Sequence, residues 1–123
     1  MKRSPILIVD DERRYADMLA RRLMLRGLTC TVRYDGRTAL DIITQEKFRM
    51  VILDLQLPDL YGTEVLARIK KHRPETAVII LTGHGTEKDR EQCMAQGAHS
   101  FMNKPLDIDL LMAIMARIEE SSA

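Results

Sequence analysis

A chain of 123 residues suits one domain, which we expect to span residues 1–123 and to bury roughly two thirds of the surface that its unfolded form exposes. Its 19 basic and 18 acidic side chains leave a formal charge of +1, which argues against direct nucleic-acid binding through a broad positive surface. Cys30 and Cys93 form no CxxC pair and no Cys/His cluster at zinc spacing, so we expect both to be buried in a reducing compartment.

The first twelve residues carry charges on both sides of an apolar run that is far shorter than a signal-peptide core or a membrane span. We therefore expect a soluble, cytoplasmic protein with no membrane partner. The run itself, residues 6–9, is continuous and rich in β-branched residues, which is typical of a parallel strand buried on both faces.

The next segments alternate between helical and strand patterns. A one-faced helix should end near Gly27, a weaker strand at residues 28–34 should lie at or near a sheet edge, and a second helix should follow. The apolar faces of these two helices carry Tyr15, Met18, Leu19 and Leu23, and then Ala39, Leu40 and Ile43.

The second half of the chain repeats this alternation. Buried strands are predicted at residues 50–53 and 77–81, and a weaker strand at 100–102. A third helix lies between the first two of these strands, a fourth runs from about residue 87 to 96 before Gly97, and a fifth follows Pro105. The apolar faces of the third and fifth helices carry Val65, Leu66 and Ile69, and then Leu110, Leu111, Ile114, Met115 and Ile118.

Five strands alternating with five helices predict an α/β fold, a doubly wound parallel sheet with helices on both faces and strand order 2-1-3-4-5. In such a sheet, ligands bind beyond the carboxyl ends of the strands where the strand order reverses. Polar residues follow four of the predicted strands: Asp10 and Asp11, Asp54, Thr82, and Lys104. We therefore expect these side chains to meet in one crevice.

Three carboxylates within a few ångströms of one another repel, and a hard divalent cation removes that conflict. We expect Mg²⁺, held by Asp10, Asp11 and Asp54, with the backbone carbonyl of Gln56 as a further oxygen ligand. Asp54 can then act as a nucleophile toward a phosphoryl group, and the Lys104 ammonium and the Thr82 hydroxyl can contact the product.

The chain resembles the receiver domains of two-component response regulators. The resemblance rests on these residues together with Glu12, Pro58, Gly62, Leu81, Gly83, Phe101 and Pro105. The resemblance covers nearly the whole chain and implies a flavodoxin-like fold. It implies that Asp54 accepts a phosphoryl group from a histidine kinase or a phosphotransfer protein, with Mg²⁺ bound by Asp10 and Asp11 and with Lys104 at the phosphoryl group. It also implies a cis peptide bond between Lys104 and Pro105.

The resemblance further implies how the signal leaves the site. Thr82 and Phe101 would rearrange on phosphorylation and alter the surface of the fourth helix, fifth strand and fifth helix, which is also a candidate homodimer interface. By the same resemblance, we expect Gln56 and His84 to occupy the two positions whose side chains tune the lifetime of the phosphoryl group. Such a domain is a phosphoacceptor that promotes its own phosphorylation and slow dephosphorylation rather than an enzyme, and its output domain or target is unknown.

Other interpretations remain open at this point. Asp10 and Asp11 suit the start of a helix, and a lone Asp54 suits a turn. A phosphatase resembling haloacid dehalogenases would need an aspartate where Gln56 stands. A nucleotide or flavin binder would need a loop rich in Gly, Ser or Thr after the first strand, and a receiver-like binding protein that is never phosphorylated has the same fold.

Overall fold

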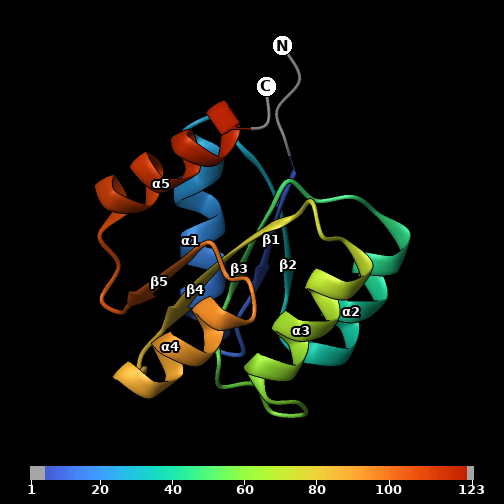
Figure 1. The fold of residues 1–123 in the computed structure, drawn as a ribbon. Helices are drawn as coiled ribbons and strands as arrows, with labels where there is room; N and C mark the ends of the chain where they lie inside the picture. The colour runs from blue at the N-terminus through green and yellow to red at the C-terminus, as the bar shows by residue number, and fades with distance from the viewer. Residues whose placement is uncertain (1–4, 122–123) are drawn as a thin grey trace.

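The computed structural model describes residues 5–121, over which strands and helices alternate strictly (Figure 1). The strands are β1 (Pro5–Val9), β2 (Thr29–Arg33), β3 (Met50–Leu53), β4 (Ala77–Thr82) and β5 (Ser100–Asn103). The helices are α1 (Arg13–Leu25), α2 (Gly36–Gln45), α3 (Gly62–His72), α4 (Glu87–Ala95) and α5 (Ile108–Ser121). Every strand and helix expected from the sequence is confirmed.

The strands form one sheet in the order β2-β1-β3-β4-β5, and each neighbouring pair is parallel. The predicted order is confirmed, and β2 and β5 are the edge strands, as expected. The order reverses between β1 and β3, so the chain leaves these two strands toward opposite faces of the sheet, into α1 and α3.

Helices cover both faces of the sheet, with α1 and α5 on one face and α2, α3 and α4 on the other (Figure 1). Successive strand residues point to opposite faces, so each central strand contributes to two separate hydrophobic cores. In β1, for example, Ile6 and Ile8 join the core under α1 and α5, whereas Leu7 and Val9 join the core under α2 and α3. This double burial explains the continuous apolar runs in the sequence.

Local signals fix the helix ends. Gly27 and Gly97 have φ angles of 84° and 100°, which only glycine adopts without strain, and they follow α1 and α4 as predicted. The Asp35 carboxylate accepts the backbone N–H of Thr38 at the start of α2. Within residues 5–121, no helix combines the length and the apolar character needed to cross a lipid bilayer.

Two expectations about burial were wrong. Leu110 is 49% exposed, although we expected it on the apolar face of α5. The buried side of this helix is centred on Leu111 and Ile114, and Leu110 is rotated from Leu111 by about 100° around the helix axis, toward solvent. Cys30 is only half-buried, whereas Cys93 is fully buried. The reason is that Cys30 lies on the edge strand β2, which has a neighbouring strand on one side alone.

Candidate functional site

The carboxyl ends of the central strands bring the predicted polar residues together. The backbone N–H of Asp54 donates to the carbonyl of Val9 over 2.9 Å, and that of Lys104 donates to the carbonyl of Thr82 over 2.8 Å. Parallel pairing therefore continues one residue beyond these strands and aligns Asp10, Asp54 and Lys104 at the same edge of the sheet. The peptide bond between Lys104 and Pro105 is cis, as the resemblance implies.

The Lys104 ammonium stands at the centre of the acidic residues. Its Nζ lies 2.9 Å from Asp10 Oδ2, 2.7 Å from Glu12 Oε1 and 3.4 Å from Asp54 Oδ2. The lysine side chain is 11% exposed. Burial acts to lower the pKa of Lys104, but the hydrogen bonds to Glu12 and Asp10 and the charge of Asp54 outweigh it and raise the pKa above its usual range. The lysine is therefore held in its charged form.

Asp54 has different partners on its two oxygens. Its Oδ1 accepts the Thr82 hydroxyl over 2.9 Å and the backbone N–H of Gln56 over 3.2 Å. Its Oδ2 accepts a single and longer hydrogen bond among residues 5–121, from Lys104 over 3.4 Å. Asp54 and Thr82 are both buried, at 4% and 1% exposure. Water is thus largely excluded from a carboxylate whose Oδ2 oxygen is lightly engaged.

The acidic cluster has the composition of a site for a hard divalent cation. Carboxylate oxygens of Asp10, Glu12 and Asp54 all lie within 4.8 Å of one another, and oxygen donors of this kind are those that Mg²⁺ prefers. Burial raises the pKa of Asp10, and the charge of Asp54 adds to that effect, while hydrogen bonds from Lys104 and from the backbone of Glu12 oppose it. The single positive charge of Lys104 does not balance the carboxylates of Asp10, Glu12 and Asp54, so the cluster is suited to bind a further cation.

Asp11 does not join this cluster in the structure. Its side chain is exposed, whereas that of Glu12, which the sequence did not single out as a ligand, reaches Lys104. Glu12 occupies the position before the first residue of α1, where the chain turns into the helix, and its side chain makes no capping hydrogen bond. Asp10 accepts the Glu12 backbone N–H over 2.9 Å and so does help to start α1. The predicted metal contact of Asp11 stays a prediction.

Comparison with known proteins identifies this site. The family model described as "Response regulator receiver domain" matches residues 6–116. The chain belongs to this family. Its acidic cluster fits the phosphorylation site of a receiver domain, at which Mg²⁺ binds.

Individual relatives of this receiver domain agree with the family assignment. The uncharacterized transcriptional regulatory protein YkoG of Bacillus subtilis (strain 168) is 35% identical over 113 residues, 92% of this chain and 50% of that protein. The transcriptional regulatory protein GlrR of Escherichia coli (strain K12) is 35% identical over 122 residues, 98% of this chain and 28% of that protein. The chain thus spans half or less of the length of these relatives.

A solved structure shows the same fold over its whole length. The response regulator receiver domain protein (CheY-like) from Methanospirillum hungatei JF-1 has a TM-score of 0.92 at 30% identity, with 98% of each chain covered. At 98% coverage, the match takes in the five strands and the five helices of this receiver domain.

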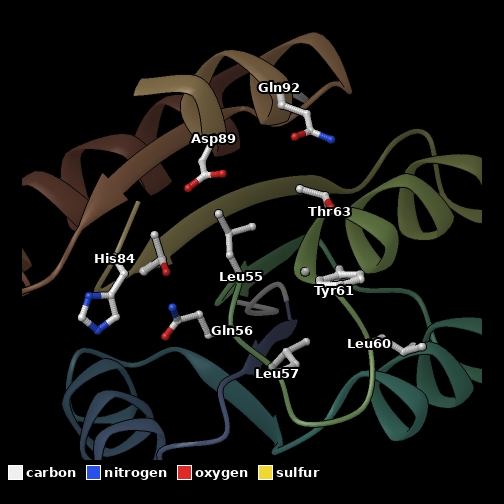
Figure 2. Close-up of a pocket in the computed structure, with 11 residues that line it drawn as sticks. Leu55, Gln56, Leu57, Leu60, Tyr61, Thr63, His84, Asp89 and Gln92 are labelled. Carbon is white, nitrogen blue, oxygen red and sulfur yellow. The ribbon is translucent and has the colours of Figure 1, made fainter. Parts of the chain in front are cut away.

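An open pocket of about 520 Å³ lies beside the buried Asp54–Thr82 pair of the receiver domain. It is bounded by the loop after β3, the start of α3, the loop after β4, and α4, and Figure 2 shows its walls. Gln56 and His84 lie at one end of the pocket, near each other and exposed, while Asp89 projects from α4 (Figure 2). The two residues predicted to tune the phosphoryl lifetime therefore both border the entrance to the site.

The loop after β3 is tightly constrained in this receiver domain. Gln56 and Tyr61 form an antiparallel bridge, and the backbone N–H of Gly62 donates to the carbonyl of Leu55 over 3.0 Å. A Cβ atom on Gly62 would lie 2.3 Å from the Leu55 Cα, so only glycine fits there. This explains why a glycine stands eight residues after Asp54.

Phe101, the predicted switch residue, is half-buried on β5. Its ring lies so close to the loop after β4 that a Cβ atom on Gly85 would come within 2.5 Å of the ring. Thr82 is the last residue before that loop, and the loop leads directly into α4. A displacement of Thr82 toward the phosphoryl site and a rotation of Phe101 would therefore affect the same loop.

Proposed function

We propose that this receiver domain, residues 1–123, is a phosphorylation-controlled switch with Asp54 as its phosphoacceptor. The observation that carries the proposal is the environment of the Asp54 carboxylate. Oδ1 accepts hydrogen bonds from Thr82 and Gln56, while Oδ2 accepts one from the Lys104 ammonium alone among the described residues. Oδ2 is thus the oxygen that we expect to attack phosphorus.

The transfer step follows from this geometry. The Asp54 Oδ2 oxygen forms a bond to the phosphorus of a phosphohistidine on a histidine kinase or phosphotransfer protein. The phosphorus–nitrogen bond breaks, its electron pair stays on the imidazole nitrogen, and that nitrogen takes up a proton. The product is an acyl phosphate, a dianion at neutral pH. Lys104 then donates to one phosphoryl oxygen and Thr82 to another.

Mg²⁺ belongs in the same proposal. Asp10, Asp54 and Glu12 already form one oxygen-donor set, and Asp11 and the Gln56 backbone carbonyl are the further ligands expected from the sequence. A bound Mg²⁺ supplies positive charge to the oxygens of the transferring phosphoryl group. The role of the carboxylates is to hold that charge beside Asp54 without blocking Oδ2.

We propose that the signal leaves through Thr82 and Phe101 to the surface of α4, β5 and α5. The phosphoryl oxygens compete with Asp54 Oδ1 for the Thr82 hydroxyl, so phosphorylation favours a second position of the loop after β4. The Phe101 ring touches that loop at Gly85 and must adjust with it. A coupling free energy of about 1–3 kcal/mol is enough for a usable switch.

The wider role of the protein is also a proposal. Two relatives are named transcriptional regulatory proteins and are at least twice as long as the matched region. We infer that this domain acts as the phosphoacceptor part of such a system in the cytoplasm and leaves DNA binding to another domain or protein. It promotes its own phosphorylation and dephosphorylation rather than turning over a substrate. The surface of α4, β5 and α5 is the candidate homodimer interface.

A small phosphoryl donor with Mg²⁺ tests the proposal directly. We expect mass spectrometry to show one added phosphoryl group on Asp54, and beryllofluoride with Mg²⁺ to shift the amide signals around Thr82 and Phe101. Asp54→Asn should abolish both responses. Asp41→Asn is the matched control, because Asp41 is exposed on α2. An unmodified wild type, or an unchanged spectrum on addition of beryllofluoride, would mean that the proposal is wrong.

A further inference from the structure

Lys104 has a fourth neighbour that the family motifs do not include. Its Nζ lies 4.2 Å from the centroid of the Tyr15 ring, a distance typical of an attraction between a cation and an aromatic face. Tyr15 is in the first turn of α1 and is half-buried against the core beneath α1 and α5. The ring is therefore held by the core on one side and faces the acidic cluster on the other.

The Tyr15 hydroxyl does not explain this placement. The oxygen is buried and has no hydrogen-bond partner within residues 5–121. Burial also raises the pKa of Tyr15, so a neutral ring rather than a phenolate faces Lys104. The aromatic face is thus the part of Tyr15 that interacts with the site, and phenylalanine would preserve it.

The ring has a property that the carboxylates lack. The three N–H groups of Lys104 match three carboxylate partners, Asp10, Glu12 and Asp54. When a phosphoryl group forms on Asp54, the ammonium must turn at least one donor toward it and release a present partner. Hydrogen bonds depend on the direction of each N–H, whereas attraction to the ring face depends mainly on the position of the charge. The ring can therefore hold the ammonium in place while its hydrogen-bond partners change.

We propose that Tyr15 is a positioning residue for Lys104. The Tyr15 ring holds the Lys104 ammonium beside the acidic cluster, within reach of the phosphoryl group. This inference rests on the proposed function, because it assigns Tyr15 a part in phosphorylation of Asp54. Tyr15 touches no reacting atom and acts through Lys104 alone.

Two variants separate the ring from its hydroxyl. Tyr15→Phe keeps the aromatic face, and Tyr15→Leu removes it while filling much of the same apolar space. In the protein without phosphoryl donor, NMR signals of the Lys104 Cε and Hε atoms should show the ring-current shift in wild type and Tyr15→Phe and lose it in Tyr15→Leu. With a small phosphoryl donor and Mg²⁺, Tyr15→Leu should be phosphorylated roughly 2-fold to 30-fold more slowly, whereas Tyr15→Phe retains the wild-type rate.

A double-mutant cycle distinguishes positioning from a general effect on the fold. In a Lys104→Met background, replacing Tyr15 with leucine should change the rate of phosphorylation no further. An equal loss with and without Lys104 would assign Tyr15 a structural role and overturn the inference, as would equal rates for wild type and Tyr15→Leu. A wild type that takes up no phosphoryl group would instead overturn the proposed function, and the Lys104 shifts would still report where the ring lies.

Discussion

Asp59→Ala removes a carboxylate that ties the loop after β3 to the start of α2. Asp59 Oδ1 accepts the backbone N–H of Gly36 over 2.8 Å, and Oδ2 accepts that of Arg37 over 2.9 Å. These two N–H groups are among those at a helix start that have no partner within the helix. The contact therefore stabilises α2 and anchors the loop that follows Asp54.

The structure sets the size of the effect. Losing a capping side chain costs about 0.5–2 kcal/mol, and the upper two thirds of this range apply because two N–H groups lose a charged partner. Gly36 is buried, so water replaces the lost hydrogen bond poorly there. The Asp59 side chain is 22% exposed, which keeps the cost below that of a fully buried pair. We expect Asp59→Ala to lower the free energy of unfolding by about 1–2 kcal/mol at pH 7.

The effect should depend on pH in a defined direction. Burial acts to raise the pKa of Asp59, but hydrogen bonds from the backbone N–H of Gly36 and Arg37 hold it below its ordinary value of 3.8. A carboxyl whose pKa is lower in the folded state stabilises the fold above its unfolded pKa, and this stabilisation is lost as the pH falls through the folded pKa. The difference between wild type and Asp59→Ala should thus be full at neutral pH and shrink below pH 3.8.

Urea unfolding followed by circular dichroism, at neutral pH and at steps below pH 4, measures this difference. Asp41→Ala is the matched control, because Asp41 lies exposed on the same helix and its side chain makes no hydrogen bond to residues 5–121. The free energy of unfolding of Asp41→Ala should stay within about 0.5 kcal/mol of that of wild type. Equal stability of wild type and Asp59→Ala at pH 7, or a difference that persists undiminished in acid, would refute the reasoning.

Three further predictions concern stability and reactivity. Thr76→Val removes the buried hydroxyl that donates to the Phe48 carbonyl over 2.8 Å, and urea unfolding should show a loss of about 1–3 kcal/mol; wild-type stability would contradict this. Gly62→Ala forces a Cβ against the Leu55 backbone, so phosphorylation by a small donor should drop sharply, and a normal rate would count against the tight loop. Burial raises the pKa of the Cys30 thiol to about 11. Alkylation of Cys30 at pH 8 should therefore be about 100-fold slower in the folded than in the unfolded chain. A folded-state rate within tenfold of the unfolded-state rate would contradict the burial.

Much of the fold and part of the site followed from local patterns. Continuous β-branched runs predicted β1, β3 and β4, because strands covered on both faces need apolar residues at every position. Once the strand order was inferred, Asp10, Asp54, Thr82 and Lys104 had to converge, since the carboxyl ends of parallel strands share one edge of the sheet. Their convergence was confirmed. The phosphoacceptor role of Asp54 remains a proposal that rests on these companions.

The amino-acid sequence by itself determined the order of elements, the two-sided burial of the sheet and the set of polar strand ends, because each of these depends on residues within one short segment. Only the tertiary structure decided which of several adjacent acidic residues reaches Lys104, since the turn of the chain into α1 sets the direction of each side chain. The same holds for the Tyr15 ring at Lys104. Such contacts depend on how α1 and the end of β5 are placed relative to each other in space. These segments are distant in the sequence, so no local pattern encodes their placement.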